Sequence, residues 1–302
     1  MDKYYKKWFF PLALPSIILF LFVILIPFIM GVLYSFTGWR GTYFFNGVTS
    51  VSNPFEAMVG FKNYVAAFQN KKFVDSFVYT LEFTAVSVVA INIVSLGLAM
   101  LVTSITKGVG AYRTVFFMPN LLGGLALGFI WQFIFQIVFS KILFGPEGVI
   151  PIEFLTNMTQ DKTKALFALV ILVTWQLAGY MMIIYITGLN NIPSELYEAA
   201  EIDGASAFQQ FRVITIPMLM PAITVVFFLT LANCFKLLDQ NIALTNGNFG
   251  TRTLATQILR TIKDTNPPNY GQAQAQAVIF FVLIAIVTLI QVSMTKKREV
   301  EM

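Results

Sequence analysis

The side chains best suited to chemistry lie in an acidic stretch between two strongly apolar runs. Glu198, Glu201 and Asp203 fall close together there, beside the small residues Ala199 and Ala200. Carboxylates so placed can form charge-assisted hydrogen bonds with basic groups or helix N-termini of another protein. The small alanines keep the segment slim enough to enter a groove. The pattern therefore predicts a docking element, with recognition as its chemistry.

The sequence offers few residues that could catalyse a reaction or bind a metal ion. The sequence has no histidine and a single cysteine, Cys234. Without histidine the chain cannot form a Ser-His-Asp triad, an HExxH zinc site or a histidine proton relay, and one cysteine excludes an internal disulfide and every CxxC site. We therefore predict no catalytic residue, no metal site and no bound cofactor, and we do not expect an enzyme.

The composition is that of an integral membrane protein. Apolar residues make up 57% and charged residues 12% of the chain, whereas soluble domains contain about 25% charged residues. Apolar runs of about 20 residues, long enough to cross roughly 30 Å of hydrocarbon as helices, favour a helical bundle over a β-barrel. Membrane topology explains the net charge of +5 better than nucleic-acid binding, because the basic residues cluster only at the two ends.

The apolar runs predict an all-α fold, with one transmembrane domain over residues 1–302 built as a six-helix bundle. Pro119 and Gly123 permit a bend in the third span. An acidic loop over residues 190–216 separates the fourth and fifth spans, and the segment from Asp239 to about Gln272 is expected to be an outer loop. The predicted spans are about 8–34, 75–104, 114–139, 165–189, 217–238 and 273–294.

Basic residues near the chain ends predict the orientation. They precede the first span and follow the last, and six spans place both termini on one side. The positive-inside rule puts that side in the cytoplasm, and the density of basic residues favours this topology about twofold. The acidic loop then also faces the cytoplasm. The basic residues at the ends are Lys3, Lys6, Lys7, Lys296, Lys297 and Arg298.

The acidic loop is expected to contain two short helices. Ser194 is predicted as the N-cap of the first, with Glu195 and Glu198 in the first turn, where the helix dipole favours acids. Gly204 supplies a left-handed residue that ends this helix, and a second helix begins at about Ser206. An amphipathic helix lying on the bilayer is the alternative, but such helices usually present lysine and arginine on the polar face.

Polar side chains within the fourth and fifth spans are candidates for a solute path, because such groups generally face the bundle interior or a wet cavity. Two sets follow helical spacing and together offer the amide, hydroxyl, aromatic and apolar surfaces that a sugar needs. The alternative for each is an interhelical hydrogen bond worth on average about 0.6 kcal/mol, and packing is the favoured role of Cys234 and Leu237. The candidates are Gln176, Tyr180, Thr230, Asn233, Cys234 and Leu237.

Three charged side chains lie at or near the spans. Glu82 falls roughly two turns inside the second span, where an acid is costly enough to suggest a functional group; the alternative is an acid near the outer headgroups. Lys236 and Asp239 lie three residues apart near the outer end of the fifth span. They form either a gate or an interfacial ion pair, and the pair is the favoured reading.

In the acidic loop, Glu198-Ala199-Ala200 and Asp203-Gly204-Ala205, followed by Ile216-Pro217, resemble a known motif, the EAA loop of permease subunits of binding-protein-dependent ABC importers. Ile216 stands where the usual pattern has leucine. The preceding segment from Gly188 to Tyr197 looks like the carbohydrate-uptake branch, that of the maltose-type and glycerol-phosphate-type permeases. The matching residues of the loop are Glu198-Ala199-Ala200, Asp203-Gly204-Ala205, Phe211, Ile214, Ile216-Pro217 and Pro221.

The resemblance extends over most of the chain. Further segments similar to that branch are Gly60 to Tyr64, Tyr112 to Pro119, Trp131, Trp175-Gln176, Phe235-Lys236 with Asp239, and Leu244 to Gly247. In the maltose-type permeases the corresponding parts of the fourth and fifth spans line the solute cavity, which implies the same role here for Gln176, Tyr180, Thr230, Asn233 and Leu237.

The resemblance implies a type I importer permease of the bacterial plasma membrane, surrounded by lipid, with a coupling helix between the fourth and fifth spans. Two permeases pair, a heterodimer being expected, two ATPase subunits dock on their EAA helices, and an extracellular binding protein delivers solute. This chain has no GxxxxGK[ST] loop, so ATP and Mg²⁺ are expected in the ATPase partners. By resemblance, coupling depends on Glu198, Ala199, Ala200, Asp203 and Gly204.

The expected function is ATP-driven import of a sugar or oligosaccharide by alternating access. Glycerol phosphate, polyols or other small solutes are alternatives, although a phosphorylated solute would favour basic residues at mid-membrane and only Lys236 lies near an edge. An ion-coupled secondary transporter would normally show inverted repeats and need more buried acids than Glu82. For an intramembrane enzyme, the missing histidines and the single cysteine leave few routes to catalysis, and a channel is possible but gives the acidic loop no role.

Overall fold

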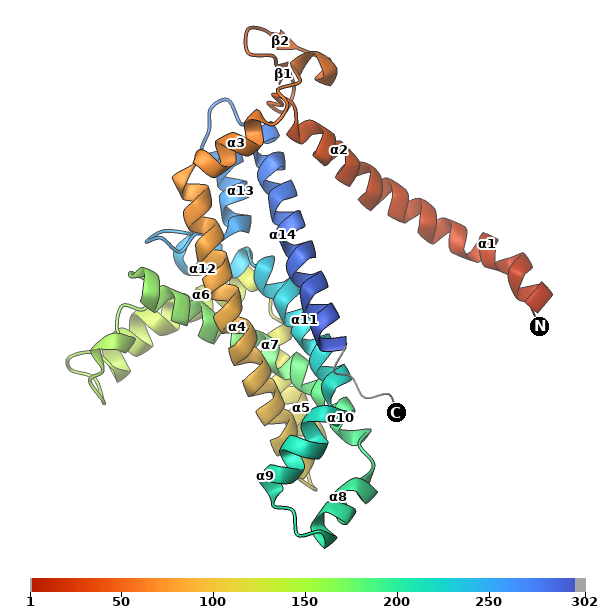
Figure 1. Ribbon diagram of the computed structural model, residues 1–302. Coiled ribbons are helices and arrows are strands. Elements are labelled where there is room, and N and C mark those ends of the chain that lie inside the picture. The colour runs from red at the N-terminus through yellow and green to blue at the C-terminus, as the bar shows by residue number, and fades with distance from the viewer. Residues whose placement is uncertain (1, 297–302) are drawn as a thin grey trace. The chain divides into compact units, whose positions relative to one another are not determined.

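A computed structural model describes residues 2–296, with side chains from Phe9 to Thr295 (Figure 1). It divides into two compact units, one of Met1–Val74 and Ile258–Val282, the other of Asp75–Gln257 and Leu283–Met302. Helices dominate the described part, as predicted. The single domain over residues 1–302 stays a prediction. Of the basic end residues, Lys297 and Arg298 lie outside the described residues, and Lys3, Lys6, Lys7 and Lys296 outside the described side chains.

The described residues contain five helices that are long and apolar enough to cross a membrane, and a bent pair raises the number to six if it forms one span. The chain is therefore membrane-spanning, and the predicted number of spans is met when the bent pair is counted. The two helices of that pair meet at an angle of 69°. The spans are Phe9–Ser35, Lys71–Ser104, Gly124–Leu143, Lys162–Asn190, Tyr270–Thr295 and the pair Ala207–Met218 with Met220–Phe235.

The first unit begins with one long helical stretch and continues into a small cap over residues 36–69, between the first two apolar spans. Asn63 fastens this cap, because its Nδ2 donates hydrogen bonds to the carbonyl oxygens of Ser35 (2.8 Å) and Thr37 (2.9 Å). Trp39 also packs on Tyr270, with ring centroids 4.9 Å apart. The elements in order are α1 (Asp2–Phe20), a π-helical turn (Leu21–Leu25), α2 (Ile26–Ser35), antiparallel β1 (Phe44–Phe45) and β2 (Ser50–Val51), a 3-10 turn (Pro54–Ala57) and α3 (Lys62–Gln69).

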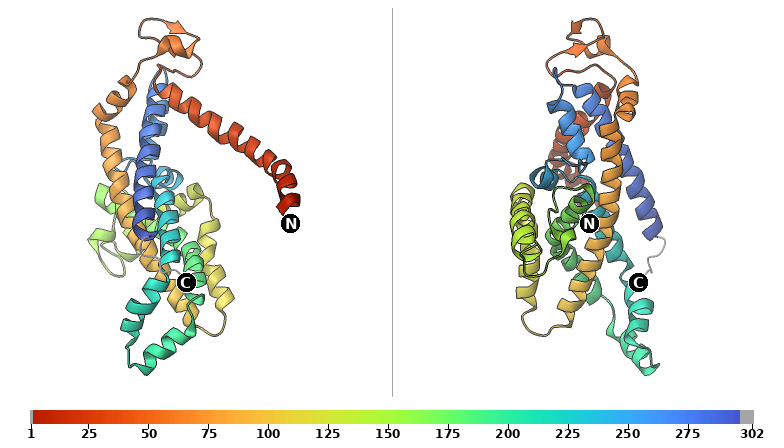
Figure 2. Two further views of the ribbon diagram at one scale, coloured as in Figure 1. Left: turned by 45° about the vertical axis from the view of Figure 1, so that its right-hand side comes forward. Right: turned by 90° about the vertical axis from the view of Figure 1, so that its left-hand side faces the viewer.

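The second unit is built around α7 (Lys162–Asn190), which packs on α5 (Val109–Phe117) and α11 (Met220–Phe235) (Figure 2). In the apolar window of α7, 61% is buried, against 33% in that of α4 (Lys71–Ser104). Gly179 permits the close approach of α5, since a Cβ there would overlap the carbonyl oxygen of Phe116. The centre of this unit is therefore a helix buried on most sides.

The third span differs from the prediction of about 114–139. Residues 109–117 form the separate helix α5, a 3-10 turn covers Met118–Leu121, and α6 (Gly124–Phe133) then continues into a π-helical stretch (Ile134–Leu143). Pro119 cannot donate a backbone hydrogen bond, and Gly123 is extended with ψ of 141°. The bend predicted at these residues is therefore a complete break, and the apolar span starts only at Gly124.

The outer segment between the fifth and sixth spans was expected to be a loop, and this is wrong. It contains α12 (Asp239–Thr245) and α13 (Leu254–Lys263), and α14 (Tyr270–Lys296) follows. The helix α12 packs closely on α6, because Gly128 leaves room for Ala243. The 7 residues of α12 are too few for a clear apolar periodicity, so packing rather than local sequence determines this helix, whereas the apolar residues of α13 do follow a helical period that the prediction missed.

Candidate functional site

The acidic loop forms the two predicted helices. The first, α8 (Ser194–Ile202), ends before Gly204, whose φ of +75° is the predicted left-handed conformation. The second, α9 (Ala207–Gln210), starts at a capping box in which Ser206 and Gln209 bond each other's backbone N–H groups. The prediction of Ser194 as N-cap is wrong. Pro193, with an extended ψ of 133°, takes that position, and its side chain has no group that could accept a capping hydrogen bond.

The surface of α8 and of the turn after it carries exposed acidic side chains together with exposed apolar side chains. Glu198, Ala199, Glu201, Asp203 and Gly204 are exposed, and Ala200 is half-buried. Two large apolar side chains flank them: Ile202 is 87% and Phe208 71% exposed. Acids beside exposed apolar side chains suit a protein partner that offers basic groups around an apolar pocket. Ile202 and Phe208 were not among the predicted residues, although their position in a polar loop is a signal that sequence offers.

The helix α8 is joined to the following helical segment by a side-chain hydrogen bond. The hydroxyl groups of Tyr197 and Thr215 lie 2.9 Å apart, and Thr215 is buried in the π-helical turn Phe211–Thr215. That turn leads through α10 (Ile216–Met218) into α11. A displacement of α8 therefore has a direct mechanical route to a span.

Three of the predicted solute residues meet in one polar cavity of about 500 Å³. Gln176 of α7 is its best-anchored group: its Oε1 accepts a hydrogen bond from Gln240 Nε2 (2.8 Å), and its own Nε2 donates to the Leu122 carbonyl (3.3 Å). Asn233 and Leu237 line the same space. The full lining is Asn120, Val173, Gln176, Leu177, Asn233, Lys236, Leu237, Leu238, Asp239 and Gln240. Asn120 was missed because the third span was predicted to be bent but not broken at Met118–Leu121, and Gln240 was missed because its segment was expected to be a loop.

Thr230 and Tyr180 lie elsewhere. Thr230 is fully buried, and its hydroxyl lies 3.3 Å from Asn92 Nδ2, while Asn92 Oδ1 accepts a hydrogen bond of 2.6 Å from Tyr185. This interhelical network joins α4, α7 and α11, which is the alternative that the sequence left open. Tyr180 packs against Phe117, with ring centroids 6.2 Å apart.

The charged candidates have different surroundings. Lys236 and Asp239 are exposed and line the polar cavity, and these two described side chains form no ion pair with each other, contrary to the favoured prediction. Glu82 pairs with Lys162 at 3.3 Å, and both side chains are about half exposed. An exposed partner of opposite charge fits an acid near the membrane surface better than a buried functional carboxylate.

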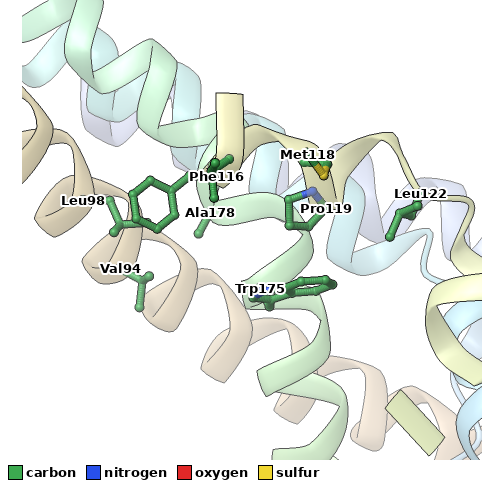
Figure 3. A pocket seen from close by; sticks show the side chains of 10 residues that line it. Val94, Leu98, Phe116, Met118, Pro119, Leu122, Trp175 and Ala178 are labelled. Atoms are coloured by element: carbon green, nitrogen blue, oxygen red, sulfur yellow. The ribbon is translucent and has the colours of Figure 1, made fainter. Parts of the chain in front are cut away.

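A second pocket, of about 530 Å³, is apolar. Figure 3 shows Val94 and Leu98 of α4 on one side, Trp175 and Ala178 of α7 on another, and Phe116 to Leu122 along the α5 break. The indole N–H of Trp175 is the one hydrogen-bonding side-chain group among its lining residues. Such a lining offers a sugar little, so the polar cavity is the better solute site.

Comparisons with known proteins agree with this architecture. AmyD of Thermoanaerobacterium thermosulfurigenes, a probable starch degradation products transport system permease protein, is 40% identical over 99% of this chain and 98% of its own. MsmF of Streptococcus mutans, a multiple sugar-binding transport system permease protein, is 32% identical over 98% and 97%. MalF of Thermococcus litoralis, of a trehalose/maltose transport system, is 30% identical over 81% and 82%.

A solved structure and a family model complete the comparison. A chain of a bacterial ABC transporter involved in the import of the acidic polysaccharide alginate has a TM-score of 0.74 over 98% of both chains, and at 20% identity it supports the fold alone. The model of the binding-protein-dependent transport system inner membrane component matches residues 64–299. The chain therefore belongs to the family of binding-protein-dependent transport system inner membrane components.

Proposed function

We propose that this chain is a permease subunit of an ATP-driven ABC importer that moves a sugar or oligosaccharide into the cytoplasm by alternating access. The observation that supports this best is the 40% identity, over nearly the whole chain, to a probable permease for starch degradation products. The polar cavity is compatible with this class of solute, since amide side chains both donate and accept hydrogen bonds from hydroxyl groups.

The chain works with other subunits in this proposal. A second permease, as a heterodimer, completes the path, two ATPase subunits bind ATP and Mg²⁺, and an extracellular binding protein delivers the solute. The ATPases dock on α8 through Glu198, Ala199, Ala200, Asp203 and Gly204. The assembly lies in a bacterial plasma membrane with both termini in the cytoplasm.

Coupling follows from the contacts of α8. ATP-driven closure of the ATPases moves the docked helix as a rigid body. Because Tyr197 is bonded to Thr215, this movement passes into α10 and then α11. The polar cavity receives Asn233 and Leu237 from α11 and its C-terminal end. A shift of α11 against α7 therefore changes the cavity and its access.

The charge of the cavity favours a neutral saccharide over glycerol phosphate. Lys236 is its one cation and Asp239 its one anion, so the lining has no net charge. A phosphorylated solute would leave its negative charge uncompensated there. A polyol shares the hydroxyl chemistry and remains the alternative that transport measurements must separate.

The test is the ATPase activity of the whole assembly in liposomes, with a panel of saccharide-loaded binding proteins added outside. We expect one loaded binding protein to stimulate the activity, and Glu198→Ala to abolish the stimulation while the assembly still inserts. The matched control is Glu147→Ala, which removes an exposed carboxylate from another loop. No ATPase associated with the wild-type chain, or no stimulation by any loaded protein, would overturn the proposal.

A further inference from the structure

A groove of about 560 Å³ lies at the C-terminal end of α12, away from the polar cavity. One wall comes from α6 and its π-helical continuation, and the other from the end of α12, the loop after it and the loop residues Thr159 and Gln160 before α7. Gln132 joins the two, because its Nε2 donates a hydrogen bond of 3.2 Å to the Leu244 carbonyl. The lining is Phe129, Gln132, Gln136, Thr159, Gln160, Ile242, Ala243, Leu244, Thr245, Asn246, Asn248 and Phe249.

The side chains exposed in this groove are of two kinds. Amides come from both walls, among them Gln136, Gln160 and Asn248, and aromatic rings come from Phe129 and Phe249, each 58% exposed. None of the lining residues is charged. Amides both donate to and accept from hydroxyl groups, and an aromatic ring covers the apolar face of a sugar. A neutral saccharide is the ligand that uses both kinds together.

The exposed ring of Phe249 is held in place by its loop. Its φ of +55° lies in the left-handed region that a bulky residue rarely adopts. Buried hydrogen bonds fix the backbone beside it: Asn241 Nδ2 donates to the Thr251 carbonyl at 2.7 Å, and the hydroxyls of Thr245 and Thr251 lie 2.7 Å apart. A strained aromatic residue that stays exposed on a well-bonded loop indicates a binding role.

The groove and the polar cavity lie at opposite ends of one short helix. The cavity takes Asp239 and Gln240 from the start of α12, and the groove takes Leu244 and Thr245 from its end. The helix has 7 residues, which is about 10 Å at 1.5 Å per residue. The cavity offers charge and amides but no aromatic ring, whereas the groove offers rings and amides but no charge.

We propose that the groove is a second saccharide site, which binds a neutral oligosaccharide before it reaches the polar cavity. The proposal rests on the function given above and adds a site to it. Amides orient the sugar hydroxyls, and Phe129 and Phe249 cover its apolar faces. The two sites lie at the two ends of α12, so a solute released from the groove has a short distance to the polar cavity.

The test uses thiol labelling of the assembled importer, because the one native cysteine, Cys234, is buried and gives little background. The variants Asn248→Cys and Gln136→Cys each place a thiol on one wall of the groove, and Val149→Cys, 76% exposed and outside the lining, is the control. The probe is the neutral oligosaccharide that stimulates the ATPase, with maltotriose used first, and no binding protein is added.

We expect the probe to slow labelling of both groove thiols by about tenfold when it is present at about ten times its dissociation constant. Labelling of Val149→Cys should not change. Adding Phe129→Leu to the Gln136→Cys variant should raise the concentration for half-protection several-fold, because leucine keeps an apolar side chain but removes the ring.

Three results would overturn the second site. The groove thiols are not protected, or all three thiols are protected equally, or protection needs the loaded binding protein, which would make the surface a protein contact. The first of these, with ATPase stimulation intact, removes the second site and leaves the proposed function standing. Loss of stimulation in the wild-type assembly instead removes the proposed function.

Discussion

The helix α8 and the polar cavity hold their polar groups in opposite ways. The carboxylates of α8 are exposed, and none forms an ion pair within the described residues. In the cavity Gln176 is buried and already bonded to Gln240 and Leu122. A partner of α8 therefore replaces hydrogen bonds that these carboxylates make to water, whereas a solute in the cavity must replace hydrogen bonds that Gln176 already makes within the protein. The bonds of the cavity are the harder to replace, which suits a weak, reversible contact with the solute there.

The largest expected effect comes from Gly204→Val. The glycine has φ of +75° and open space around it, so valine meets no clash and brings only backbone strain of about 1–3 kcal/mol. We expect α8 to end at a different residue, and the ATPase activity that the loaded binding protein stimulates to fall by about tenfold or more. Gly60→Val is the matched control, since Gly60 has φ of +60° with the same open space and lies far from α8 in the sequence. If both variants lose the same fraction of the stimulated ATPase activity, backbone strain rather than a defect in docking at α8 causes the loss.

The next largest effect is expected on the stability of the fold, at the contact between α5 and α7. Gly179→Ala should destabilise the protein by about 1–3 kcal/mol, because the added methyl overlaps the Phe116 carbonyl and forces the helices apart. Thermal unfolding of the detergent-solubilised chain measures this. Gly110→Ala is the control: Gly110 lies in α5, the other helix of this contact, has open space around it, and alanine there should stabilise the protein by about 0.5–1 kcal/mol. If Gly179→Ala leaves the thermal stability unchanged, the contact between α5 and α7 is not tightly packed.

Removing the bonds of the cavity should have a smaller effect. Gln176→Ala leaves Gln240 and the Leu122 carbonyl without their partner, at a net cost of about 1 kcal/mol per hydrogen bond. We expect saccharide uptake into liposomes to fall by about fivefold to tenfold. Docking at α8 should not change, so ATPase subunits still copurify. Gln69→Ala, at an exposed position of α3, is the control, and uptake equal to that control would remove Gln176 from the solute path.

The smallest effect is expected from Glu82→Gln. Its ion pair with Lys162 joins two half-exposed side chains, and such pairs contribute about 0–1 kcal/mol. Uptake and stability should stay near those of the wild type. Collapse of uptake, with the ATPase subunits still bound, would instead indicate a membrane carboxylate in the transport step and would favour an ion-coupled mechanism.

The two regions also differ in how far sequence predicts them. The turn at Gly204 and the cap at Ser206 depend on neighbouring residues, so local rules predict them correctly. The cavity needs groups from α7, α11, α12 and the turn before α6, and their meeting depends on packing. Gln240 was therefore missed, because α12 itself was expected to be loop. The N-cap at Ser194 failed for a local reason, since Pro193 can start the helix without a side-chain hydrogen bond.

The third span shows the same limit within an apolar segment. Its residues are apolar enough to cross a membrane from Thr114 onward, so hydropathy alone gives no break. The break at Met118–Leu121 depends on Pro119, which is buried, and on the close contact of α5 with Gly179. Proline and glycine indicate where a helix can bend, but the tertiary contact decides how sharply it does so.

The length of α7 has a consequence for the depth of α8. The helix has 29 residues, about 44 Å at 1.5 Å per residue, whereas the hydrocarbon layer is about 30 Å thick. If Lys162 and Lys164 keep the outer end at the lipid surface, the inner end extends about 14 Å past the far edge of the hydrocarbon. That overhang exceeds the 10–12 Å diameter of a helix. Under that condition α8 lies clear of the lipid tails, and the ATPase subunit proposed above can bind it without entering the bilayer.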